Sequence, residues 1–121
     1  MAVQQFRELV AWQKAMDLVA EVYRLTKVFP REEIYGLTNP VRRAAVAVPS
    51  NIAEGQGRGP GSSFANFLRI AYGSLQEVQT QILIAERLQY IDSEQVRLPM
   101  ELSDEVGRII KDLLRSLDNG P

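Results

Sequence analysis

The chain has 121 residues, of which 45% are apolar and 24% charged, and its formal net charge is −1. This length and composition are typical of one soluble globular domain, and we expect a single domain over residues 1–121. The sequence contains no cysteine and no histidine, which excludes disulfides, thiol nucleophiles, imidazole bases and the common zinc and copper ligands.

The N-terminus does not resemble a signal peptide, because no basic stretch is followed by an apolar core and a cleavage site. No apolar run approaches the roughly 18 residues that a membrane span needs, so we expect a cytoplasmic protein. The charges are distributed unevenly along the chain. Residues 39–69 contain four arginines and one acid, a net charge of +3, and residues 90–121 contain seven acids and four bases, a net charge of −3.

The first predicted helix covers about residues 6–29 and carries two apolar stripes side by side. The first stripe consists of Leu9, Trp12, Met16, Val19 and Tyr23. The second stripe consists of Ala11, Ala15, Leu18, Val22, Leu25 and Phe29. One stripe would suffice to dock a helix on a small core, and two stripes make a broad apolar face. The helix is therefore either deeply buried in its own bundle or also in contact with another subunit.

The second predicted helix runs from about residue 40 to 54, with Asn39 as its N-cap and Pro40 at its first helical position. Pro49 has no N–H to donate to the carbonyl of Ala45, so we expect a kink there rather than a break. Residues 55–61 contain four glycines and a proline, and this composition predicts a loop.

The third predicted helix covers about residues 63–91, with Ser62 or Ser63 as its cap. A strict four-three alternation predicts its buried seam: Phe64, Leu68, Ala71, Leu75, Val78, Ile82 and Ala85. Gly73 within this helix either allows close approach of a neighbouring backbone or is merely tolerated.

The fourth predicted helix covers about residues 93–117, begins at Asp92–Ser93 and is kinked or split at Pro99. Four helices with short connections predict an all-α fold, an antiparallel up-down four-helix bundle. No segment shows the alternation of a β-strand between turn signals.

The segment around Pro49 contains the polar residues Ser50, Asn51 and Glu54. Without histidine, a nucleophilic Ser50 would need a lysine or carboxylate partner, and no motif supplies one. We interpret Ser50 and Asn51 as groups that satisfy carbonyls freed by Pro49, and Glu54 as an anchor for an arginine. No catalytic residue, metal site, cofactor or small-molecule substrate is predicted, and the glycine-rich segment lacks the ending of a phosphate-binding P-loop.

Four arginines, Arg42, Arg43, Arg58 and Arg69, form the basic part of the chain. Arginine binds phosphate oxygens in pairs, and repetition of these residues around an oligomeric ring would attract a polyanion. The alternative is that they pair with Glu54, Glu77 or the acidic fourth helix, within or between subunits.

A series of short motifs in a fixed order connects this sequence with a known family. The motifs are Phe6–Leu9, Trp12–Ala15, Phe29–Pro30, Tyr35–Leu37, Arg42–Ala45, Pro49–Gly55, Phe67–Leu68, Ile70–Ala71, Gly73–Ser74 and Thr80–Gln81. In this order and spacing the chain resembles the four-helix-bundle proteins encoded in intervening sequences of bacterial 23S ribosomal RNA genes. The accessory variability determinant of diversity-generating retroelements looks like a relative of the same group.

The resemblance implies a homo-oligomer, with a pentamer as the expected state. It also implies a non-enzymatic assembly or interaction module, with RNA or a nucleic-acid-processing protein as a possible partner. The alternative function is a ring that binds RNA through its arginines. Two features depart from the family pattern: Asn39–Pro40 replaces a polar pair that includes glutamine, and the net charge of −1 is unlike the basic retroelement branch.

Overall fold

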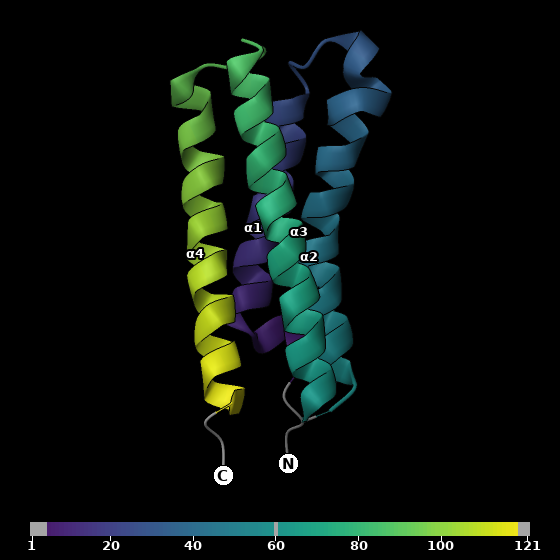
Figure 1. Ribbon diagram of the computed structural model, residues 1–121, viewed down its shortest axis with the longest axis vertical. Coiled ribbons are helices and arrows are strands. Elements are labelled where there is room, and N and C mark those ends of the chain that lie inside the picture. The colour runs from purple at the N-terminus through teal and green to yellow at the C-terminus, as the bar shows by residue number, and fades with distance from the viewer. Residues whose placement is uncertain (1–4, 60, 119–121) are drawn as a thin grey trace.

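Four long helices lie side by side in the computed structural model, which describes residues 5–59 and 61–118 (Figure 1). They are α1 (Val10–Thr26), α2 (Asn39–Gly57), α3 (Ser62–Arg87) and α4 (Ser93–Asp118). Every regular element in the described part of the chain is helical, which confirms the all-α class. The chain runs up and down along the long axis, so α1 begins and α4 ends at the same end (Figure 1).

The core is built from the apolar positions that the helical periodicity predicts. The seam of α3 is buried, and its members from Leu68 to Ala85 are at most 1% exposed. In α1 the second stripe faces the core, with Ala15, Leu18 and Val22 fully buried. Each helix packs against its neighbours in sequence, and α1 also packs against α4. The four helices therefore close into one bundle, with α1 and α3 on one diagonal.

The chain before α2 is more helical than the sequence indicates. Helix α1 begins at Val10 because Leu9 is extended after the short 3-10 turn η1 (Phe6–Glu8). The segment between the first two predicted helices contains a 3-10 turn, η2 (Arg31–Glu33), and a π-helical turn, η3 (Ile34–Thr38). Because η3 continues directly into α2, Asn39 lies inside the helix, and its prediction as the N-cap is wrong.

The predicted loop from residue 55 is shorter than expected, because α2 continues through Gly57. Gly55 is buried in the contact with α3, where a Cβ atom would lie 2.6 Å from Phe67 Cβ. A side chain at this position would collide with Phe67, so the glycine allows α2 and α3 to pack closely here. The predicted serine cap of α3 is also wrong, because Ser62 is already helical and Gly61, at φ 118°, precedes it.

Neither internal proline divides its helix. Helix α2 continues through Pro49, as expected. Helix α4 continues through Pro99, so of the two alternatives predicted there, a kink or a split, the split is wrong. Helix α4 begins with a reciprocal cap. The Gln95 N–H donates to Asp92 Oδ1 over 2.8 Å, and the Asp92 N–H donates to Gln95 Oε1 over 2.9 Å.

Candidate interaction site between α1 and α2

An apolar groove of about 380 Å³ runs between α1 and α2. Trp12, Met16 and Val19 line it from α1, and Val46, Pro49, Ser50 and Ala53 line it from α2. The residues from α1 belong to the first stripe, which the bundle core leaves partly uncovered. The side chains of Met16 and Val46 are 44% and 40% exposed. Large apolar side chains clustered in an exposed groove are typical of a contact surface.

Arg42 lies on α2 one turn before the groove residue Val46, on the side of the π-helical turn. Its Nε donates to Thr26 Oγ1 over 2.8 Å, and its guanidinium carbon lies 4.6 Å from the centroid of the Tyr23 ring. The Thr26 hydroxyl in turn donates to the Val22 carbonyl over 2.8 Å. The planar guanidinium therefore joins α2 to α1 through one hydrogen bond and one cation–π contact.

Aromatic rings lie where Trp12 lines the groove. The rings of Phe6 and Trp12 meet edge to face with centroids 5.2 Å apart. This geometry is favourable for aromatic pairs and fixes the orientation of the Trp12 indole. Phe6 therefore supports the Trp12 wall of the groove, while Met16 and Val46 stay exposed.

The polar residues around Pro49 differ in their positions and contacts. Pro49 is buried in the wall of the groove, and Ser50 lies exposed on its rim. Asn51 Nδ2 donates to the carbonyl of Ala47 over 2.8 Å, so this bond does not reach the Ala45 carbonyl that Pro49 leaves without its usual donor. Glu54 accepts two hydrogen bonds from Arg58, at 2.9 and 3.2 Å.

The structure does not gather the four predicted arginines into one patch. Arg42 and Arg43 lie in the first turns of α2, whereas Arg58 follows its last residue, roughly 24 Å away along the helix axis. Arg58 lies 5.1 Å from the centroid of the Phe67 ring, in addition to its contact with Glu54. Arg69 lies 3.3 Å from Asn66 Oδ1 and 3.9 Å from Asp118 Oδ1. Arg43 is exposed on α2.

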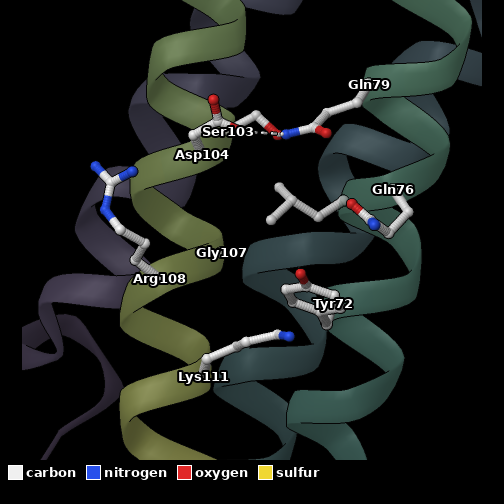
Figure 2. Close-up of a pocket in the computed structure, with 9 residues that line it drawn as sticks. Tyr72, Gln76, Gln79, Ser103, Asp104, Gly107, Arg108 and Lys111 are labelled. Atoms are coloured by element: carbon white, nitrogen blue, oxygen red, sulfur yellow. Dashed lines mark hydrogen bonds between the residues drawn. The ribbon is translucent and has the colours of Figure 1, made fainter.

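A second, polar groove of about 320 Å³ lies between α3 and α4 and was not predicted from the sequence (Figure 2). Three contacts bridge the helices there. Gln79 Nε2 donates to Ser103 Oγ over 2.8 Å and to Asp104 Oδ1 over 2.9 Å, and Lys111 Nζ lies 5.0 Å from the centroid of the Tyr72 ring. Figure 2 shows Lys111 reaching across from α4 toward Tyr72 on α3.

Ser103 and Lys111 in this groove are not placed as a nucleophile and base pair. Lys111 lies eight residues from Ser103, which is roughly 12 Å along the helix. The lysine is therefore too far away to accept a proton from the Ser103 hydroxyl. In the sequence, Gly107 is the residue that could have indicated this groove. A Cβ atom at Gly107 would lie 3.3 Å from Leu75 and 3.4 Å from Tyr72.

Within residues 5–59 and 61–118, no three or more Asp, Glu, His or Cys side chains are grouped so that they could hold a metal ion. Of the described helices, none is both long and apolar enough to span a bilayer.

The four packed helices and the uncovered apolar groove define an all-α bundle with a candidate contact surface. By its sequence, the chain belongs to the family of 23S rRNA-intervening sequence proteins, whose model matches residues 7–112. No protein with curated annotation matches the chain. A similar solved structure is a protein with unknown function from the S23 ribosomal protein family of Bacteroides thetaiotaomicron VPI-5482.

That structure has a TM-score of 0.78 and 18% sequence identity, over 88% of this chain and 99% of its own. At this level of identity the likeness shows a shared fold alone.

Proposed function

We propose that this protein is a non-enzymatic interaction module that assembles with copies of itself through the groove between α1 and α2. The observation that carries the proposal is the first stripe of α1, which the bundle core leaves partly uncovered. Its Trp12 and Met16 face Val46 and Pro49 across the groove, and this surface would be removed from water by a partner.

The charge distribution supports a second copy as the partner. Residues 39–69, which include α2, carry a net charge of +3, and residues 90–121, which include α4, carry −3. In an assembly, the exposed Arg43 on α2 of one copy can lie beside an acid on α4 of another copy, which favours association and orients it. Five copies are the expected number, because of the resemblance to the family of ribosomal intervening-sequence proteins.

Light scattering coupled to gel filtration tests the self-association. The wild-type protein should elute with a multiple of the 13.6 kDa chain mass. The double variant Met16→Glu/Val46→Glu should shift to the monomer mass, because it places charges in the apolar groove. Leu98→Glu is the matched control, since Leu98 is 46% exposed on α4, outside the groove. A monomeric wild type at micromolar concentration would contradict the proposal.

The alternative is that the assembly binds RNA through its arginines. What favours it is Arg43, an exposed guanidinium that would be repeated in every subunit. Labelled single-stranded and structured RNA should then bind tightly at about 50 mM salt and lose affinity steeply as salt rises, since phosphate contacts release counterions. The Arg42→Ala/Arg43→Ala variant should bind weakly. Absence of binding at low salt would contradict RNA binding and favour a protein partner.

A further inference from the structure

We propose that residues 31–37 form a strap that opens while the four long helices stay folded, and that a hydrogen bond between Tyr90 and Glu33 is the latch that holds it closed. The strap comprises η2 and most of η3 and lies at the end of the bundle opposite to the beginning of α1 (Figure 1). Gly36 is the positioning residue of the latch, because it leaves space for the Glu33 carboxylate. This conformational device does not depend on the proposed self-association.

The strap is anchored at both ends but has little buried surface between them. Phe29, before the strap, and Thr38, at the end of η3, are 8% and 4% exposed. Within the strap only Glu33 and Leu37 are partly buried, and the other residues are exposed, with Tyr35 at 85%. A segment with few buried apolar contacts opens at a lower free energy than the core does. The strap is therefore a unit that can open without unfolding of the bundle.

The latch joins the strap to the turn between α3 and α4. The Tyr90 hydroxyl donates to Glu33 Oε2 over 2.7 Å, and a hydrogen bond to an ionised acceptor is stronger than one between neutral groups. The Tyr90 ring lies 6.0 Å from the Phe29 ring, centroid to centroid, so the phenol is held beside an anchored end of the strap. Among the residues that the structure describes, no other side chain of the strap forms a hydrogen bond or ion pair. Loss of this bond should therefore release the strap.

Gly36 is needed for the position of the carboxylate and not for the path of the backbone. Its φ angle lies outside the left-handed region that favours glycine. A Cβ atom at Gly36 would overlap Glu33 Oε1 and lie 3.3 Å from Glu33 Cδ. The carboxylate is the far end of a flexible side chain, so a methyl group at residue 36 would rotate it to another rotamer and leave the helical backbone in place. That rotation moves the acceptor away from the Tyr90 hydroxyl.

Hydrogen exchange of the full chain, followed by mass spectrometry, tests the latch. Tyr90→Phe should raise the exchange rate of the strap amides about tenfold, because it removes a hydrogen bond to a charged group, and should leave exchange in the middle of α3 unchanged. Tyr72→Phe is the matched control, since the Tyr72 hydroxyl makes no hydrogen bond with the described residues and Tyr72 lies in α3, away from the strap. Unchanged strap exchange in Tyr90→Phe would overturn the latch.

Alanine at residue 36 tests the positioning role. Gly36→Ala should also raise strap exchange about tenfold, although alanine has the higher helix propensity. Gly73→Ala is its control, because a Cβ at Gly73 would meet no described atom within 4 Å, and it should leave the strap unchanged. The hydrogen bond to Glu33 raises the pKa of Tyr90, so an NMR titration should find a lower Tyr90 pKa in Gly36→Ala than in the wild type.

The double variant Gly36→Ala/Tyr90→Phe shows whether the two residues act through the same bond. Its strap should exchange no faster than that of Tyr90→Phe alone, because the hydrogen bond can be lost only once. Additive effects of the two substitutions, or an unchanged Tyr90 pKa in Gly36→Ala, would contradict the positioning role of Gly36. A wild-type strap that exchanged only as slowly as the buried parts of the long helices would contradict independent opening. None of these outcomes depends on the oligomer mass, so they are distinct from failure of the proposed function.

Discussion

Gly55 and Gly73 both lie within helices at motif positions, but their surroundings are opposite. Gly55 is buried where α2 meets α3, and a Cβ there would lie 2.6 Å from Phe67 Cβ and 3.1 Å from Phe64 Cδ1. At Gly73 a Cβ would meet no described atom within 4 Å. The sequence left two interpretations of Gly73, close approach of a neighbouring backbone or a tolerated glycine. Within the subunit the first interpretation does not hold, and the close approach occurs at Gly55 instead.

Alanine substitution should separate the two glycines. Gly55→Ala should lower the free energy of unfolding by about 1–3 kcal/mol, because the methyl group overpacks the contact with Phe67. Gly73→Ala should raise it by up to about 1 kcal/mol, because alanine has the higher helix propensity. Urea unfolding of both variants measures the difference. A stabilising Gly55→Ala would contradict the close helix contact.

Tyr90 joins the turn before α4 to the turn η2. Its hydroxyl donates to Glu33 Oε2 over 2.7 Å, and its ring centroid lies 6.0 Å from that of Phe29. The hydrogen bond to the Glu33 carboxylate raises the pKa of Tyr90 above its ordinary value, and burial and the charges of Glu33 and Glu32 act in the same direction. The folded protein thus holds the phenolic proton more tightly than the unfolded chain does.

This pKa shift predicts a loss of stability in alkaline solution. Because the folded-state pKa is raised, the contribution of Tyr90 is fully present below about pH 10 and is lost as the pH rises through the folded-state value. The free energy of unfolding of the wild type should therefore fall more between pH 8 and 11 than that of Tyr90→Phe. Equal losses in the two proteins would rule out this linkage.

At the scale of the helices, the reciprocal cap of α4 is the clearest local determinant. Asp92→Ala should lower the free energy of unfolding by about 1 kcal/mol, since it removes the acceptor for the Gln95 N–H. Ser93→Ala is the control, because Ser93 is the exposed neighbouring residue and Asp92, not Ser93, accepts that bond. Thermal unfolding of the two variants should differ, and equal melting temperatures would show that the cap contributes nothing.

Helix periodicity predicted the buried seam of α3 because the apolar residues of this seam recur at alternating intervals of four and three residues. The rotation of α1 was not predictable in the same way, since Leu9 and Ala11 both begin apolar stripes and only packing selects between the two stripes. The continuation of α2 through Gly55 was not predictable from the sequence either. It depends on Phe67, a residue beyond the glycine-rich segment, whereas the composition of residues 55–61 alone favours a loop. The groove depends on both α1 and α2, so its shape required the structure.

At the scale of the whole molecule, self-association should make thermal stability depend on concentration. Partners that bind only the folded chain shift the unfolding equilibrium by mass action. The melting temperature of the wild type should therefore rise with protein concentration, while that of Met16→Glu/Val46→Glu should stay constant. Calorimetry over a hundredfold range of concentration measures this effect. A constant melting temperature for both proteins would argue against the groove as a subunit contact.

The contact between α1 and α4 has a kinetic consequence. The other helix pairs in contact are consecutive in the chain, whereas this pair joins the first and last helices, for example through Lys14 Nζ and Glu105 Oε2 at 3.5 Å. Closing the longest loop costs the most chain entropy, so this pair should form late in folding. Since α1 begins where α4 ends, a circular permutant with a short linker between them would make this contact local and should fold faster.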